Sequence, residues 1–345
     1  MPTTKTTPRS APARALQTKR RSLIKLGLGL PALGISGLGL GLSSRAHAAT
    51  FPNEPVTLIV PFPAGGATDN QMRALSVPLS KLLNQTVIIS NKPGVGGTLG
   101  PSTMARSARP DGYTMCVVVG TLFRYPFIQE VSYDPLKDFT YIANLTGYSY
   151  GIVVRDDAPW KTLNELIEDG KRRPNAISFG ATGVGGTGHI VMERLQRATG
   201  AQFNFVPYKG AAEETTALLG GHIGFVSDAG WGPIIDTKRT RMLAVMGAER
   251  AKRVPDVPTL TELGFNIVAA NPVGVVGPAG IPPEVVKTLQ DALFKASEDP
   301  DYIRTLELAD QVPQLMNAGQ YREYAGKQVA EEKRYMDELG LSLKK

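Results

Sequence analysis

The sequence has few of the residues from which hydrolytic and metal-dependent enzymes build their sites. It holds one cysteine and three histidines in 345 residues. A single cysteine cannot form a disulfide within the chain, and no cysteine and histidine cluster has the spacing of metal ligands. The metalloprotease motif H-E-x-x-H is also absent. We therefore expect no metal and no cofactor, and the composition favours a function other than catalysis.

The few histidines and the cysteine stand at positions that suggest structural roles. His189 lies where a helix is expected to begin, and His222 follows two glycines in a turn. Each position suits a capping or surface residue better than a general base. Cys116 lies in the strand-like run 113–119 and is expected to be a small buried apolar residue. None of these residues indicates an enzyme.

Acidic residues are missing from the first 49 positions, which carry eight basic ones. An uncharged run rich in leucine and glycine covers 26–42, and the A-x-A pattern of a cleavage site follows at 46–48. This pattern predicts a signal peptide over residues 1–48. The segment 19–25 resembles a twin-arginine export motif. A membrane anchor is the alternative, but six glycines and a proline make the run a poor membrane span.

The excess of positive charge belongs to this leader. The whole chain carries 38 basic and 31 acidic side chains. Without the eight basic residues of the leader, 30 basic side chains face 31 acidic ones. The mature chain therefore gives no electrostatic reason to expect nucleic acid or a membrane surface as a partner.

The remaining residues are numerous enough for two lobes, and strand-like and helical segments alternate along them. We expect an α/β fold with lobe 1 formed by 49–150 plus 272–345 and lobe 2 by 151–271. The aromatic stretch 121–135 is expected to be irregular. From Pro283 onward the pattern predicts a layer of charged helices.

One stretch near the start of the mature chain combines a strand, a glycine loop and a helix start. Val56–Val60 is uncharged and reads as a strand buried on both faces. The prolines and glycines of 61–66 exclude regular structure. Thr68 and Gln71 have the spacing of a capping box, and Asp69 suits the first turn of a helix. Such a loop presents main-chain N–H groups to an anion.

A second stretch repeats this arrangement. A glycine loop over 180–188 follows a short strand and precedes a helix that carries His189. Its G-x-G-x-x-G pattern matches the dinucleotide fingerprint, but Val206–Lys209 stands where that fold needs a carboxylate. Two such loops, one per lobe, could share one anion in a cleft. The alternative is that the glycines only allow close packing.

Six motifs, in order, resemble the Bug-type solute receptors of tripartite tricarboxylate transporters, and the likeness covers essentially the whole mature chain. The motifs are Pro61–Asp69, Asn91–Gly97, Pro110–Thr114, Tyr133–Pro135, Val206–Gly210 and Pro255–Thr259.

The resemblance implies a two-lobed periplasmic binding protein of the Venus-flytrap type, with the ligand in a cleft between the lobes. Its ligand would be a small mono- or dicarboxylate, delivered by a monomeric receptor to the membrane permease subunits. The residues that the resemblance and the loop pattern together assign to the ligand are Phe62, Ala64, Gly65, Gly66, Thr68, Asp69, Ala181, Thr182, Gly183, Gly186, Thr187, His189, Pro207, Tyr208 and Asp228.

Two further residues bear on specificity. Arg124 could pair with a second carboxylate or face solvent, and we favour the solvent-facing position. Trp231 could line an aromatic pocket or pack between the lobes. Two other function classes stay open beside the transport receptor. They are a ligand-sensing partner of a sensor kinase and a secreted enzyme.

Overall fold

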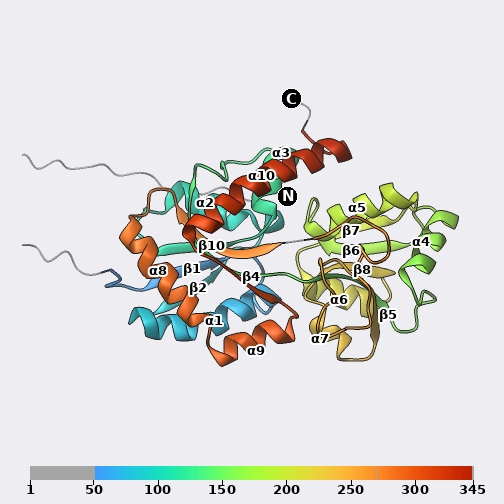
Figure 1. Cartoon of the computed structure of the whole chain (residues 1–345), viewed down its shortest axis with the longest axis horizontal. Coiled ribbons are helices and arrows are strands. Elements are labelled where there is room, and N and C mark those ends of the chain that lie inside the picture. Colours follow the sequence, from blue (N-terminus) through green and yellow to red (C-terminus); the bar gives the residue numbers. More distant parts are fainter. Residues whose placement is uncertain (1–50, 270, 344–345) are drawn as a thin grey trace, which may run out of the picture. The chain divides into compact units, whose positions relative to one another are not determined.

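The structure is a computed structural model that describes residues 51–269 and 271–343, within a single compact unit (Figure 1). The predicted signal peptide lies outside the described residues. Strands and helices alternate along the chain, and the strands form two separate sheets. This arrangement confirms the predicted α/β fold. Among the described residues, no helix is long and apolar enough to cross a membrane.

The first sheet has six strands in the order β11-β4-β10-β3-β1-β2. Its strands β1, β2 and β3 run parallel to one another, while β10 is antiparallel to β3 and β4, and β11 is antiparallel to β4. The strands are β1 (Val56–Val60), β2 (Val87–Asn91), β3 (Thr114–Val118), β4 (Phe139–Gly147), β10 (Pro272–Pro278) and β11 (Val312–Met316).

Both faces of this sheet are buried, because strand residues alternate between two hydrophobic clusters. Leu58 and Val60 belong to the cluster that includes residues of α1 and α8, which lie against each other. Ile59, between them, belongs to the cluster that includes residues of α2, α3 and α10. The prediction of a doubly buried strand is therefore confirmed. The helices around this sheet are α1 (Ala67–Leu83), α2 (Leu99–Ser107), α3 (Thr121–Ile128), α8 (Pro283–Ala296), α9 (Pro300–Leu308) and α10 (Ala318–Leu339), with a short 3₁₀ turn η1 (Val95–Gly97).

The second sheet has five strands in the order β7-β6-β8-β5-β9. Its strands β7, β6 and β8 are parallel, and β5 is antiparallel to β8 and β9. The elements are β5 (Tyr150–Arg155), α4 (Leu163–Arg172), β6 (Ser178–Thr182), α5 (Thr187–Thr199), β7 (Asn204–Tyr208), α6 (Ala211–Leu219), β8 (Phe225–Ala229), α7 (Gly232–Ile235) and β9 (Thr240–Val245).

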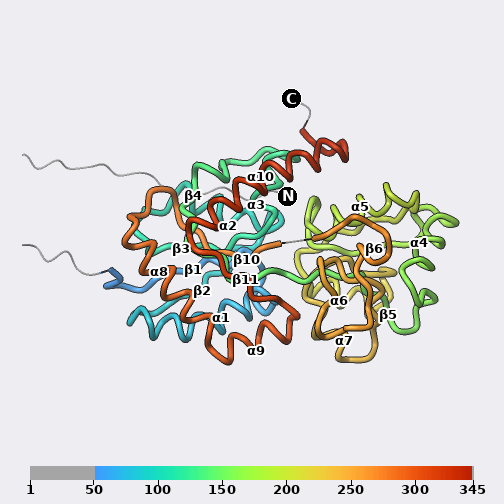
Figure 2. Tube along the Cα trace, in the orientation of Figure 1, coloured from blue at the N-terminus to red at the C-terminus, as the bar shows by residue number. Residues whose placement is uncertain are grey.

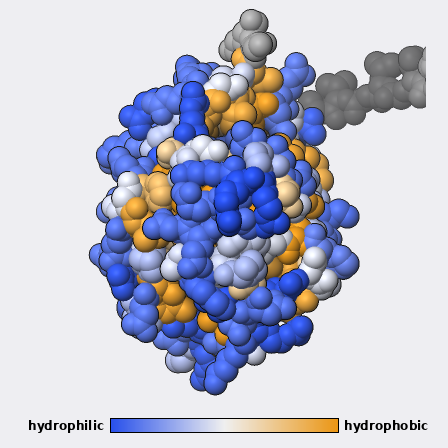
Figure 3. Space-filling model, turned by 90° about the vertical axis from the view of Figure 1, so that its right-hand side faces the viewer, coloured by the Kyte–Doolittle hydropathy of each residue, from blue (hydrophilic) through white to orange (hydrophobic). Residues whose placement is uncertain are grey.

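The helices of this sheet also cover both of its faces. Residues of α4 and α5 share a cluster with Phe179 and Phe225, and residues of α6 and α7 share another with Val153 and Val226. The surface shown in Figure 3 is mainly hydrophilic with scattered apolar residues, as expected of amphipathic helices around a buried sheet.

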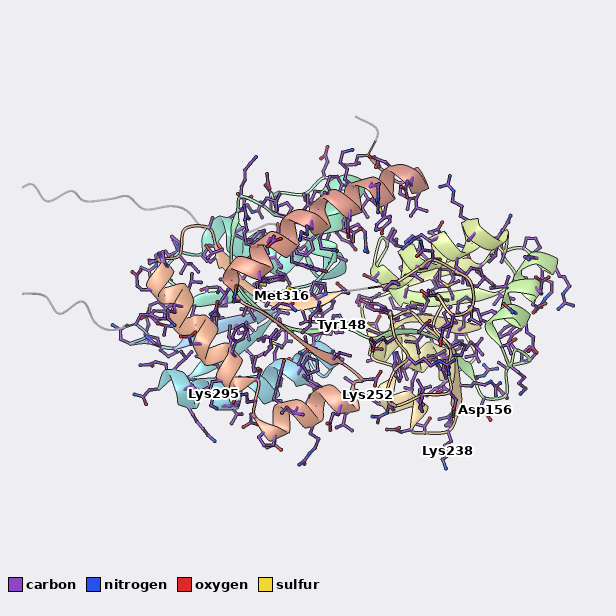
Figure 4. All side chains as sticks on the ribbon, viewed as in Figure 1. Tyr148, Asp156, Lys238, Lys252, Lys295 and Met316 are labelled. Carbon is purple, nitrogen blue, oxygen red and sulfur yellow. The ribbon has the colours of Figure 1, made fainter. Side chains whose placement is uncertain are left out.

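The chain passes between the two sheets along two neighbouring segments. It leaves β4 and enters β5 at 147–150, a passage that can be followed in Figure 2, and it enters β10 just after Asn271. The main-chain N–H of Tyr148, labelled in Figure 4, donates to the carbonyl oxygen of Asn271 at 2.9 Å. The two connecting segments therefore lie side by side and are joined by a main-chain hydrogen bond.

One of the element predictions is wrong, and another is incomplete. The stretch 121–135, expected to be irregular, contains the helix α3, whose aromatic residues Phe123 and Tyr125 are buried. The layer of helices expected from Pro283 onward is confirmed by α8, α9 and α10, but the region also contributes the strand β11, which was not predicted and pairs with β4 at the edge of the sheet. Both elements depend on tertiary contacts rather than on a regular hydrophobic pattern.

The predicted capping box at Thr68 is also wrong. Helix α1 begins at Ala67, its N-cap is Gly66, and no side chain caps it. The hydroxyl of Thr68 is hydrogen-bonded to the hydroxyl of Tyr148 instead. Glycine at this position leaves the first N–H groups of the helix without a side-chain acceptor.

Candidate functional site

A cavity of about 130 Å³ lies among loops of both sheets. One water needs about 10–15 Å³ of such volume, so the cavity has room for a small organic molecule. The first sheet contributes the loop after β1, and the second contributes the loops after β6 and β7 and the end of β8. The carboxyl ends of strands are the usual place for ligands in open α/β sheets.

The N-terminal ends of four helices line this cavity. Their first residues there are Ala67 of α1, Thr121 of α3, Thr187 of α5 and Ala211 of α6. All four helices have a glycine N-cap and none has a side-chain cap. The first N–H groups of a helix have no intrahelical acceptor and carry a partial positive charge. The cavity thus concentrates main-chain donors that suit a negatively charged group.

Hydroxyl and amide groups occupy the part of the wall where the chain passes between the sheets. Tyr148, Tyr150 and Asn271 line the cavity. The amide nitrogen of Asn271 donates to the hydroxyl of Tyr150 at 2.5 Å, and its amide oxygen accepts from the main-chain N–H of Gly120. Burial raises the pKa of both tyrosines, so they remain neutral and act as polar, uncharged groups.

A pair of buried carboxyl groups lies on the side of the second sheet. Asp228, which lines the cavity, accepts from the main-chain N–H groups of Thr182 at 2.6 Å and Ala229 at 2.7 Å. Glu214 of α6 lies behind it and accepts from the hydroxyl of Thr182 at 2.9 Å. Burial and the neighbouring charge of Asp228 raise the pKa of Glu214 well above its ordinary value, and burial also raises that of Asp228.

Comparison with known proteins identifies the family. The model of the "Tripartite tricarboxylate transporter family receptor" matches residues 71–341. The chain belongs to this receptor family. It is 41% identical over 326 residues to a Cupriavidus necator protein described as "UPF0065 protein in gbd 5'region", with 94% of this chain and 98% of that protein covered.

Solved structures agree with this assignment. The periplasmic binding protein BugD is 28% identical with a TM-score of 0.79, and the match covers 85% of this chain and 99% of that one. MatC from Rhodopseudomonas palustris with bound malate is 25% identical with a TM-score of 0.75, covering 83% and 99%. The Bug-type resemblance and the two-lobed periplasmic binding protein fold are thereby confirmed. The family is one of solute-binding receptors and not of enzymes.

About half of the residues predicted to hold the ligand line the cavity of the receptor. They are Phe62, Ala64, Gly66, Thr68, Thr182, Gly186, Thr187 and Asp228. The others do not line it. They are Gly65, Asp69, Ala181, Gly183, His189, Pro207 and Tyr208.

Asp69, at the start of α1, is engaged in local hydrogen bonds. Its carboxylate accepts from the main-chain N–H of Gly65 at 2.9 Å, from Arg73 Nε at 2.8 Å and from the amide of Asn91 at 2.8 Å. Burial alone would raise the pKa of Asp69, but these bonds and the charge of Arg73 lower it overall. Asp69 therefore fixes the first glycine loop against β2.

His189 plays a comparable part in the second glycine loop. Its Nδ1 accepts from the main-chain N–H of Gly185 at 3.0 Å, and its ring stacks on Phe205 at a centroid distance of 4.0 Å. Gly185 precedes the helix, so His189 holds the loop and does not cap α5. His222, by contrast, is exposed in the turn after α6.

The solvent-facing position favoured for Arg124 is wrong. The side chain is buried and forms two hydrogen bonds of 2.7 Å with the carboxylate of Glu332 in α10. A third hydrogen bond of 2.9 Å reaches the carbonyl oxygen of Gly185 in the second glycine loop. Its charge is thus already paired, and the guanidinium does not line the cavity.

Trp231 packs in the core rather than in an aromatic pocket. Its side chain is buried in the cluster between β9 and α7, and its indole N–H donates to the carbonyl oxygen of Ser149 at 3.0 Å. Ser149 is the centre of Gly147–Gly151, the G-x-S-x-G sequence of hydrolase nucleophile turns. Here that sequence joins β4 to β5, two strands, instead of a strand to a helix. The segment therefore lacks the strand-to-helix turn that exposes the nucleophilic serine of a hydrolase.

Sequence reasoning missed a third loop of the same kind. Gly210, Ala211 and Ala212 line the cavity where β7 gives way to α6. The signal was present in the sequence, because the strand-like run Phe203–Val206 is followed by Gly210 and then by a helical pattern. Tyr148 and Asn271 lie in connecting segments, and Tyr150 is the first residue of β5. They were missed because no recognisable sequence pattern singles them out.

Proposed function

We propose that this receptor binds a small organic carboxylate in the cavity and delivers it to the membrane permease of a tripartite tricarboxylate-type transporter. The observation that carries the proposal is the convergence of four helix N-termini without side-chain caps on one cavity. Such termini stabilise an anion without a cationic side chain. A family member with bound malate supports a carboxylate ligand.

In this proposal the carboxylate is held mainly by main-chain N–H groups of the first and second glycine loops, at Gly66–Thr68 and Gly186–Thr187. The loop at the start of α6 adds a third set of donors. Lobe 1 would comprise 49–150 plus 272–345, lobe 2 would comprise 151–271, and the receptor would act as a monomer.

The test is calorimetric titration of the mature protein with mono- and dicarboxylic acids, their amides and uncharged sugars. We expect at least one acid to bind and the matching amide to bind at least tenfold more weakly, because the amide lacks the charge that the helix termini stabilise. An uncharged sugar that binds more tightly than every acid would overturn the proposal.

We also propose export by the twin-arginine route, with cleavage next to Ala49. The motif at 19–25 and the A-x-A pattern support this route. Replacing Arg20 and Arg21 together by Lys should leave the precursor in the cytoplasm, as measured by cell fractionation and immunoblotting. A double variant that reaches the periplasm normally would point to the general secretory route.

A further inference from the structure

A buried ion pair joins two helices that lie against the same face of the first sheet. Arg124 of α3 donates from Nε and Nη2 to the two carboxylate oxygens of Glu332 in α10, each at 2.7 Å. The two side chains are 7% and 8% exposed. Removing both charges from water offsets most of their attraction, so such a pair contributes little net stability. Its significance lies in what else the guanidinium contacts.

The third edge of the guanidinium faces the second glycine loop. Nη1 of Arg124 donates to the carbonyl oxygen of Gly185 at 2.9 Å and lies 3.5 Å from the hydroxyl oxygen of Thr187. The guanidinium is planar and its donors have a fixed geometry, so the two bonds to Glu332 also fix the direction of Nη1. Arg124 therefore reaches the loop as a rigid donor rather than as a flexible cation.

The second glycine loop has few side chains of its own to hold its conformation. Gly183 and Gly185 have φ values of 71° and 74°, a region that glycine adopts more readily than other residues. The direction of each peptide group therefore depends on its hydrogen bonds. Gly185 N–H donates to His189 Nδ1, and Gly186 N–H donates to the carbonyl oxygen of Gly183. The carbonyl oxygen of Gly185 is held by Arg124, from the other lobe.

The residues that follow this contact form part of the cavity wall. Gly186 and Thr187 line the cavity, and Thr187 is the first residue of α5. Arg124 does not line it, and Glu332 balances its charge. The arginine is therefore not placed to act as the counter-ion of a bound acid. It is placed to orient the start of α5.

We propose that Arg124, fixed by Glu332, is a positioning residue of the ligand site, which holds the second glycine loop from the opposite lobe and so orients the start of α5. Because the contact joins the two lobes, it breaks when they part to release the ligand. Its loss should accelerate ligand dissociation and leave association nearly unchanged. This inference rests on the proposed function and deepens it.

The experiment removes both partners of the ion pair at once. Arg124→Met combined with Glu332→Leu deletes the contact with Gly185 and leaves no unpaired charge buried, a kind of replacement that is often neutral for stability. The probes are malate, succinate, lactate and propionate. Calorimetry on the whole mature protein gives Kd, and stopped-flow fluorescence gives the rates. For each acid that binds the wild type, we expect Kd to rise at least about tenfold, the loss typical of a hydrogen bond to a charged group. The rise should come from faster dissociation.

Two readouts distinguish positioning from direct ligand contact and from a general loss of structure. Kd should rise by the same factor for monocarboxylates and dicarboxylates, because Arg124 acts on the loop and not on the ligand. In the acid-bound protein, hydrogen exchange of the segment 183–188 should become faster, while that of the first glycine loop, 63–68, should not change.

The matched control is Lys327→Met combined with Glu323→Leu, which removes an exposed ion pair from the same helix α10. It should leave Kd and the exchange of 183–188 unchanged. Circular dichroism and thermal melts establish that each variant is folded.

A folded double variant with the Kd values of the wild type would refute the positioning role of Arg124. A slower association rate as the only change would refute it too, and so would a loss confined to the dicarboxylates, since Arg124 would then contact the ligand. If the double variant does not fold, Arg124→Lys decides the question. It keeps a charge beside Glu332, but one ammonium nitrogen cannot form the fork and also reach Gly185. It should bind each acid at least about tenfold more weakly, and wild-type affinity in this variant refutes the role.

The outcomes also separate the role of Arg124 from the proposed function. If Arg124 proves dispensable while the wild type binds acids, carboxylate binding stands. If the wild type binds an uncharged sugar and none of the four acids, the proposed function fails. Titration of the same variants with that sugar then still decides whether Arg124 positions the loop.

Discussion

At the scale of single residues, several polar side chains around the cavity stabilise its wall rather than face a ligand. The hydroxyl of Thr68 is bonded to that of Tyr148, which joins helix α1 to the segment that connects the two sheets. Asn271 joins Tyr150 to the main chain that precedes α3. Each such bond links elements that are distant in sequence, so the starts of α1 and α3 are both held by the segments that connect the two sheets.

The buried pair of carboxyl groups should affect stability in a defined direction. The pKa of Glu214 is raised above the value of 4.5 for an unperturbed glutamate. Between the unfolded and folded pKa values the folded state binds more protons than the unfolded state, so the free energy of unfolding falls as pH rises. Below the pKa of Glu214 in the unfolded state, the residue is protonated in both states and does not make the free energy of unfolding depend on pH.

Glu214→Gln cannot ionise and should therefore lose less stability than the wild type between pH 5 and pH 8. Urea unfolding at a series of pH values, followed by circular dichroism, measures the difference. Glu213→Gln, at the exposed neighbouring residue, is the matched control. It should change the dependence of the unfolding free energy on pH less than Glu214→Gln does. Parallel profiles for wild type and Glu214→Gln would mean that Glu214 is ionised in the folded protein.

At the scale of elements, the sequence predicted those parts whose pattern is local. The strand Val56–Val60 and the helix after the second glycine loop follow from hydrophobic runs and glycine positions. Helix α3 was not predicted, because it contains Pro126 and aromatic residues whose burial depends on α10. Glu332 lies 208 residues from Arg124, so no local pattern could show that this arginine is paired and buried.

A substitution at Gly186 tests how closely the main chain of the second glycine loop is packed. Gly186 has φ −61° and ψ 162°, a conformation that any residue can adopt. A Cβ there would nevertheless overlap the carbonyl oxygen of Thr182, so the loop and the start of α5 would have to move. Gly186→Ala should weaken ligand binding at least tenfold and destabilise the fold by roughly 1–3 kcal/mol.

The matched control for this substitution is Gly326→Ala in α10. A Cβ at Gly326 meets no atom within 4 Å, and alanine should stabilise the helix by about 0.5–1 kcal/mol. Calorimetry and urea unfolding of both variants test the comparison. A folded Gly186→Ala variant with wild-type affinity would show that the ligand does not depend on this end of α5.

At the scale of the whole molecule, side chains of α3 hold the second glycine loop from the other lobe. The hydroxyl of Tyr125 donates to the carbonyl oxygen of Val184 at 2.7 Å, and Arg124 donates to that of Gly185. Gly186 and Thr187, the next residues of this loop, line the cavity. Helix α10 also contacts the second lobe, where Arg194 of α5 stacks over the ring of Tyr335 at 4.7 Å. These contacts exist only when the lobes are together.

Tyr125→Phe should therefore weaken ligand binding without weakening the fold of either lobe. It removes one hydrogen bond between the lobes and keeps the buried ring, which corresponds to about 0.5–1.5 kcal/mol, or roughly a 2- to 13-fold rise in Kd. Tyr133→Phe is the control, because the Tyr133 hydroxyl donates to the carbonyl oxygen of Leu122 within the same lobe at 3.2 Å. That variant should lose stability instead of affinity. Calorimetry gives the Kd values, and small-angle scattering of the ligand-free proteins should show Tyr125→Phe as the more open. If both variants bind the ligand like the wild type, the contact between α3 and the second glycine loop does not contribute to closure.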